Sequence, residues 1–278
     1  MGRIRIFTPA RGLLAGALCI AGLLHAQDLE DYQVPRPASS HKNALQVIAN
    51  YYKVQGGRGN VDGIETSITF LQMSNGRPGE RYYQLRDHGH KGFLEVYSAS
   101  HLGRDVSNIN GFNGETFWTL SLADREPEFF RLSGIGRELE RMYLNLFAPL
   151  PRFDMEGCLY TFEGKVRVRG RETYEIQRHP PYGIPAYVAF DAKTFLPYRA
   201  TYKTRYAGVI VDAEVFYQKY IRQDGLWLAG QLERTLTGEK ESTATLLQFE
   251  QGLRINPAVF DPVSTAEGWL KSKSKLPF

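Results

Sequence analysis

Apolar and polar residues alternate with a period of two through most of the chain after residue 64. In the first such run, Ile64, Ile68 and Phe70 are separated by polar neighbours. A period of two predicts strands that bury one face, and the Asn-Gly and Asp-Gly pairs between the runs predict tight turns. Further strands are expected at residues 81–87, 92–98, 105–110, 115–121, 159–163, 165–169, 173–178, 187–191, 197–206, 209–220, 226–237 and 243–254.

Two segments instead have helical spacing. The first follows Ser39 and Ser40, either of which can cap it, and Gly56-Gly57 can end it in the left-handed conformation. Its apolar residues form two neighbouring stripes, namely Leu45, Ile48 and Tyr52, and Ala44, Val47 and Tyr51. The second helix is expected from Ile135 to Phe147, with Leu139, Met142 and Leu146 on its apolar face and Pro149 beyond its end.

This pattern predicts a mainly β protein. Thirteen or so strands are too many for a small sandwich. We expect one strongly curved antiparallel sheet, a half-open β-barrel, with about two helices covering its concave face. Such a sheet leaves an apolar concavity that side chains or a ligand must fill, and the helix at 135–147 is either ordinary core or a movable element that gates the concavity.

Residues 1–26 are typical of an export signal. Arg3, Arg5 and Arg11 precede an apolar run from Gly12 to Leu24, which is too short for a membrane span. These three arginines also account for most of the net charge of +4, so the remainder is near neutral and nucleic acid is not an expected partner. We expect a periplasmic protein whose residues 27–278 form a single domain.

The sequence offers little catalytic chemistry. It contains no GxSxG elbow, glycine-rich phosphate loop or HExxH motif. His88 and His90, with His101 downstream, have the spacing of a possible metal pair or of a hydrolase site, but Gly89 between them favours a turn. Cys158 follows the export signal as a lone cysteine, which predicts no intramolecular disulfide. We therefore expect no metal, no cofactor and no enzymatic activity.

Five motifs in order carry a family resemblance. They are Tyr51-Tyr52 before Gly56-Gly57, residues 111–118 (GFNGETFW), residues 191–199 (DAKTFLPYR), residues 217–228 (YQKY to GLWL) and Asn256-Pro257 before Phe260. Over residues 40–262 the chain resembles the LolA-like outer-membrane lipoprotein-sorting proteins. The resemblance implies a half-open barrel whose concave face receives acyl chains beneath helices, with donor and acceptor proteins in the inner and outer membranes as partners.

We therefore expect a soluble periplasmic carrier or binder of lipoprotein acyl chains or another apolar ligand, in lipoprotein sorting or lipid transport. Alternation and helical spacing select the expected cavity and lid residues, although a filled core would use many of the same positions. These residues are Ile68, Phe70, Leu85, Trp118, Leu120, Leu139, Met142, Leu146, Val188, Phe190 and Trp227.

Two alternatives remain open. The barrel can have a filled interior and act as a non-catalytic scaffold in an envelope complex. Peripheral contact with a membrane is also possible, because Lys165, Arg167 and Arg169 alternate along one strand face. A solvated strand face is the simpler interpretation of that stripe.

Overall fold

The computed structural model describes residues 38–74, 81–88, 92–101, 104–113, 116–121, 127–128, 145–153, 157–180, 184–206 and 209–261. Its helices are α1 (Ala38–Val54), α2 (Arg58–Asp62) and the 3-10 helix η2 (Pro257–Phe260). Its strands are β1 (Thr66–Ser74), β2 (Arg81–Asp87), β3 (Gly92–His101), β4 (Arg104–Asn113), β5 (Phe117–Ser121), β6 (Pro127–Glu128), β7 (Leu159–Val168), β8 (Arg171–His179), β9 (Ala186–Asp191), β10 (Pro197–Tyr206), β11 (Val209–Gln218), β12 (Ile221–Gln223), β13 (Leu226–Leu228), β14 (Gln231–Leu236) and β15 (Glu239–Gln251).

Thirteen of the described strands form one antiparallel sheet. Its order is β6-β5-β4-β3-β2-β1-β15-β14-β11-β10-β9-β8-β7. Two meanders therefore meet where β15, late in the chain, pairs with β1. The short strands β12 and β13 form a separate hairpin between β11 and β14 in the chain.

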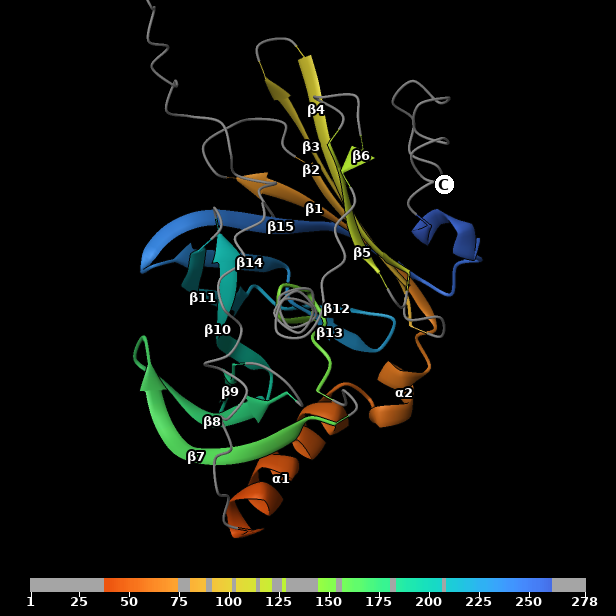
Figure 1. Ribbon diagram of the computed structural model, residues 1–278. Helices are drawn as coiled ribbons and strands as arrows, with labels where there is room; N and C mark the ends of the chain where they lie inside the picture. Colours follow the sequence, from red (N-terminus) through yellow and green to blue (C-terminus); the bar gives the residue numbers. More distant parts are fainter. Residues whose placement is uncertain are drawn as a thin grey trace, which may run out of the picture.

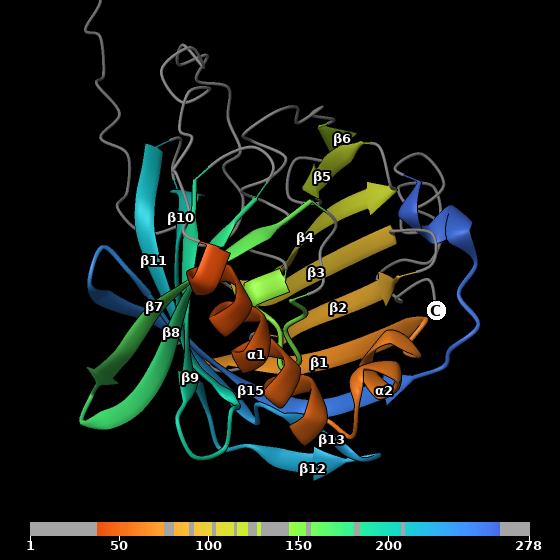
Figure 2. The ribbon, with the colours of Figure 1, turned by 90° about the horizontal axis from the view of Figure 1, so that it is seen from below.

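The sheet curves strongly around α1, which lies across its concave side (Figures 1 and 2). Strands β6 and β7 are the two ends of the described sheet, and they do not pair with each other. This architecture confirms the predicted half-open antiparallel barrel with helices on its concave side. No helix within the described ranges is long and apolar enough to cross a membrane.

The concave side holds the larger hydrophobic cluster. Ala44, Val47 and Tyr51 of α1 are buried there against strands of the C-terminal meander. The segment 145–153 fills the space beside α1, and the Tyr51 hydroxyl donates to the Pro151 carbonyl at 2.8 Å. Burying this stripe is what makes a 17-residue helix stable across the mouth of a barrel.

A second hydrophobic cluster lies on the opposite, convex face of β1 to β5. It contains Ile68, Leu85, Leu94, Val96, Ile109, Trp118 and Phe260, with Phe70 packed against it. The chain after β15 covers this face, since the Thr66 hydroxyl donates to the Leu253 carbonyl at 2.7 Å and the Trp118 indole donates to the Phe260 carbonyl at 2.9 Å. The C-terminal segment 253–260 therefore belts the outside of the sheet, which the sequence pattern does not predict.

Several predicted elements differ from the structure. Residues 159–163 and 165–169 are one strand, β7, because an irregularity between Phe162 and Gly164 replaces the predicted turn. Residues 226–237 are two strands, β13 and β14, separated at Gly230. The short helix α2 was not predicted. Most of the predicted helix 135–147 lies outside the described residues, including Leu139 and Met142.

The turn between β9 and β10 is built by Asp191. Its Oδ1 accepts hydrogen bonds from the backbone amides of Lys193 and Thr194, each at 2.9 Å. Its Oδ2 lies 3.3 Å from Arg171. Burial raises the pKa of this carboxyl, but the hydrogen bonds from Thr194 and Lys193 and the Arg171 charge outweigh it, so its pKa lies below the ordinary 3.8.

Asp191→Ala is expected to lower the free energy of unfolding by about 1–2 kcal/mol at neutral pH, because two amides lose a charged acceptor. Because the pKa of Asp191 is lower in the folded state, its ionised carboxylate stabilises the fold at pH values above the unfolded-state pKa. This stabilisation is lost as the pH falls through the folded-state pKa. The difference in the free energy of unfolding between the unmodified protein and Asp191→Ala should therefore become smaller below pH 3.8. Urea unfolding at pH 7 and pH 3 measures it. Asp191→Asn is the control, because its side-chain oxygen can still accept from the backbone amides of Lys193 and Thr194. An equal loss of stability in both variants would contradict the hydrogen-bond explanation.

Candidate ligand-binding groove

The outward-facing side of α1 forms one wall of a groove of about 850 Å³. The lining residues of this helix recur every three or four positions, which places them on one face. They are His41, Leu45, Ile48, Ala49, Tyr52 and Lys53, followed by Gly56, Gly57 and Arg58. The opposite wall consists of Phe153, Cys158, Leu159 and Tyr160.

The N-terminal end of α1 is fixed to the edge strand β7. The Ser40 hydroxyl donates to the Phe162 carbonyl at 3.0 Å and accepts from the Phe162 amide at 2.9 Å. The His41 ring nitrogen Nδ1 lies 2.8 Å from the Tyr160 carbonyl and must donate to it. These side chains satisfy part of the open edge of β7, which would otherwise offer unpaired backbone groups.

The C-terminal end of α1 is fixed to the β12–β13 hairpin. Gln55 Nε2 donates to the Trp227 carbonyl at 3.0 Å, and Gln55 Oε1 accepts from the Trp227 amide at 2.7 Å. The helix then ends as predicted at Gly56 and Gly57, both with positive φ, and the Gly57 amide donates to the Tyr52 carbonyl at 2.8 Å. The glycine pair places no side chain at this end of the groove.

The second wall is tied to α1 between these two anchors. The Phe153 amide donates to the Tyr52 hydroxyl at 3.1 Å, and the Tyr160 hydroxyl donates to the Phe153 carbonyl at 2.5 Å. The rings of Tyr51 and Phe153 meet edge to face, with centroids 5.2 Å apart. Both walls are therefore held before any ligand arrives, which is typical of small-molecule sites.

The surface of the groove is largely apolar. Leu45 is 45% exposed and Leu159 is 50% exposed, which is high for leucine side chains that lie in one hollow. Cys158 is half-buried there, and the buried Arg178 side chain donates from Nε to its Sγ at 3.5 Å. The arrangement can remove an apolar chain from water without any further folding.

The predicted cavity residues do not line this groove. Ile68, Phe70, Leu85 and Trp118 lie together in the convex cluster under the C-terminal belt. Leu146, Val188 and Phe190 are fully buried in the concave core, with half-buried Trp227 packed against it. Leu120 belongs to β5, but its side chain lies outside the described residues, as do Leu139 and Met142. Their role in binding stays a prediction.

The residues that do line the groove had a signal in the sequence. The apolar surface of α1 is two stripes wide, and one stripe is enough to bury a helix against a sheet. Ala44, Val47 and Tyr51 pack into the concave core. Leu45, Ile48 and Tyr52 line the groove, where Ile48 and Tyr52 are also buried in that core and Leu45 is 45% exposed. The sequence therefore shows the second apolar stripe, but it does not show that this stripe lines a groove.

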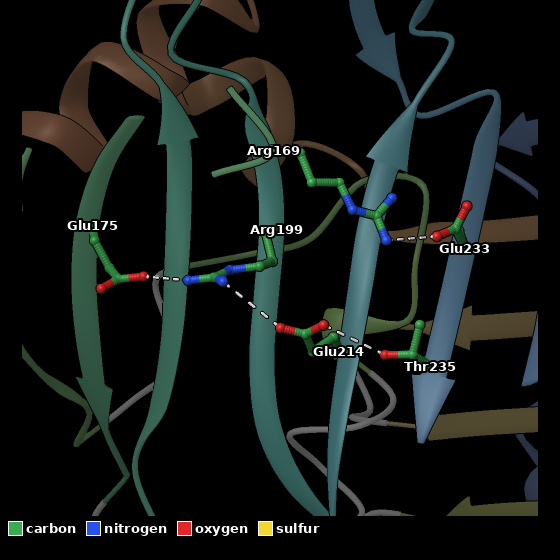
Figure 3. Close-up of polar contacts among 6 residues, drawn as sticks. All are labelled: Arg169, Glu175, Arg199, Glu214, Glu233 and Thr235. Atoms are coloured by element: carbon green, nitrogen blue, oxygen red, sulfur yellow. Dashed lines mark hydrogen bonds and ion pairs between the residues drawn. The ribbon is translucent and has the colours of Figure 1, made fainter. Parts of the chain in front are cut away.

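The convex face of the C-terminal meander carries paired charges. Arg199 lies between Glu175, at 2.7 Å, and Glu214, at 3.7 Å (Figure 3). Arg169 pairs with Glu233 at 2.9 Å and stacks over the Phe216 ring, 3.5 Å from its centroid. The positive stripe expected at Lys165, Arg167 and Arg169 does not continue through Arg169, which follows the end of β7 with a φ of 45°. Lys165 lies over the Tyr174 ring, and Arg167 lies 3.8 Å from Glu172.

The candidate metal pair lies only partly within the described residues. His88 and His101 are described, but His90 lies outside the described residues. Within the described ranges, no group of three or more His, Cys, Asp or Glu side chains is placed to hold a metal ion.

The chain is similar in fold to several solved bacterial proteins. A DUF1329 family protein from Desulfovibrio piger superposes with a TM-score of 0.54 at 16% identity, covering 81% of this chain and 98% of that one. A protein from Vibrio parahaemolyticus, described as an outer membrane lipoprotein-sorting protein domain, gives a TM-score of 0.53 at 13% identity over 81% and 99%. A LolA superfamily protein from Nitrosomonas europaea gives 0.51 at 11% identity over 78% and 96%.

Sequence comparison adds nothing to this, since no family model and no curated protein matches the chain. At such low identity the likeness concerns the fold alone. It nevertheless agrees with the resemblance carried by the five motifs, two of which are now seen as the end of α1 at Gly56-Gly57 and the Asp191 turn. The chain therefore has the fold of the LolA-like lipoprotein-sorting proteins.

Proposed function

We propose that this protein is a non-catalytic periplasmic carrier or binder of acyl chains, or of another apolar ligand, that works in lipoprotein sorting or lipid transport. The observation that carries the proposal is the preformed apolar groove of about 850 Å³ between α1 and the Phe153–Tyr160 wall. The likeness in fold to a LolA superfamily protein and to a lipoprotein-sorting domain supports it.

The mechanism is physical and involves no bond chemistry. Each methylene of an acyl chain that leaves water contributes about 0.8 kcal/mol. The two walls are fixed at both ends of α1, so little conformational entropy opposes binding. The groove is also open to solvent along the exposed Leu45 and Leu159 side chains, which lets a chain leave toward an acceptor. Donor and acceptor proteins of the two membranes are the proposed partners.

Filling the groove should abolish binding. Ala49 is exposed on the groove wall, so Ala49→Trp would occupy the hollow without disturbing the core. We expect the affinity for a neutral fluorescent acyl probe to fall by at least about tenfold, the equivalent of two or more lost methylene contacts. Fluorescence titration and native lipid mass spectrometry of the purified protein measure this.

Gln46→Trp is the matched control, since Gln46 is exposed on the same helix but does not line the groove. It should bind the probe like the unmodified protein. Equal affinity in all three proteins would remove the groove as the site. An unmodified protein that binds no probe and carries no lipid, but crosslinks to an envelope protein, would favour the scaffold alternative.

A further inference from the structure

The groove is charged at one end only. Among the described residues, its lining contains His41, Lys53 and Arg58 and no acidic side chain. His41 lies at the N-terminal end of α1 and is engaged with the Tyr160 carbonyl, whereas Lys53 and Arg58 flank Gly56 and Gly57 at the other end, here called the mouth of the groove. An apolar trough with a cationic mouth matches a ligand that has an apolar tail and an anionic head.

We propose that the groove binds a long-chain fatty acid, with its carboxylate at Lys53 and Arg58 and its tail running toward Leu45 and Leu159. This inference rests on the proposed function and specifies the ligand of the same site. The tail would follow α1 from Lys53 back to His41, a distance of about 18 Å at 1.5 Å per residue. That path lies along a single helix face, which suits one acyl chain better than two.

Lys53 is available for such a head group. It is exposed in the last turn of α1, and no ion pair to its ammonium is found among the described residues. Arg58 is also exposed and pairs with Asp62 at 3.1 Å, with its guanidinium 5.8 Å from the centre of the Tyr52 ring. An exposed pair of this kind is weak, so the contact with Asp62 by itself does not prevent the guanidinium from binding a carboxylate ligand.

The end of a helix normally repels an anion, because its last carbonyls form a negative pole. Here these carbonyls already have donors. The Tyr51, Tyr52 and Lys53 carbonyls accept from the amides of Gln55, Gly57 and Gly56. The Gln55 carbonyl accepts from Asn60 Nδ2 at 2.8 Å. Capping weakens this negative pole, and Lys53 and Arg58 together with Asp62 give the mouth a net positive charge among the described residues.

The test compares palmitate with hexadecanol, which has the same tail and no charge, by calorimetric titration at low salt. We expect palmitate to bind about tenfold more tightly, since two exposed charge contacts are each worth a few-fold. The double change Lys53→Met, Arg58→Gln should remove this preference, so that the ratio of palmitate affinity to hexadecanol affinity falls to about one. Lys42→Met is the control, because Lys42 is exposed on α1 but does not line the groove.

The outcomes separate the two proposals. Equal binding of palmitate and hexadecanol, or an unchanged preference in the double variant, would overturn the anionic head group while the carrier function stands. Failure of both amphiphiles to bind would overturn both proposals. Extraction of phosphatidylglycerol from vesicles in preference to palmitate would overturn the assignment to a single-chain ligand.

Discussion

Trp118→Ala is expected to lower the free energy of unfolding by about 3–5 kcal/mol, the range for removing a large buried aromatic side chain. Trp118 is only 2% exposed, and its indole nitrogen donates to the Phe260 carbonyl at 2.9 Å. Its ring packs onto Gly111 so closely that a Cβ built there would lie 2.1 Å from the indole. The ring lies between the sheet at Gly111 and the C-terminal belt at Phe260, so we expect these two segments to close only part of the cavity that its removal leaves.

Chemical denaturation measures this loss, and probe titration of the folded variant measures binding. Trp118 lies in the convex cluster and outside the groove, so the folded variant should bind an acyl probe with unchanged affinity. Trp118→Phe keeps most of the packing and loses the hydrogen bond, and should cost clearly less. A variant of normal stability with weakened probe binding would instead place Trp118 in the ligand site, as alternation first suggested.

The fate of Ile68, Phe70, Leu85 and Trp118 shows what alternation can and cannot predict. Alternation placed these residues on one face of one sheet, and the register confirms this, since Ile68 pairs with Leu85. It cannot tell which face of a curved sheet is concave. The concave face of these strands is the other one. It carries the apolar residues Leu71 and Tyr82, but also the buried polar residues Ser67, Thr69 and Gln84, which made it look like the exposed face.

The belt was unpredictable for a different reason. Residues 253–260 have neither a period of two nor helical spacing, and only Asn256 capping η2, with its side chain accepting from the Ala258 amide, is local chemistry. Its stability comes from contacts with β1, β3 and β4, which are distant in the chain. Local patterns therefore predicted the strands, the α1 boundaries and the openness of the barrel, but not the segment that seals its outside.

The same limit applies to the groove. The width of the apolar stripe on α1 could be read from the sequence, whereas the wall facing it comes from residues more than 90 positions later in the chain. Only the three-dimensional contacts of Ser40, His41 and Gln55 show that α1 is held rigidly beside that wall. We expect Gln55 to contribute most of the three, because its side chain pairs with both the amide and the carbonyl of Trp227, as a neighbouring strand would.

Gln55→Ala is expected to lower the free energy of unfolding by about 2–4 kcal/mol, because it leaves both the amide and the carbonyl of Trp227 without the partner that the side chain provides. Gln55 is 1% exposed, so water cannot readily replace it. Urea denaturation measures the loss, and faster hydrogen exchange of the Trp227 amide would locate it. Gln46→Ala, on the exposed side of the same helix, should change stability by no more than about 0.5 kcal/mol. If both variants behave alike, the bidentate contact to Trp227 does not anchor α1. The helix is then held by Ser40 and His41 and by the hydrogen bonds of Tyr51 and Tyr52 to the 145–153 segment.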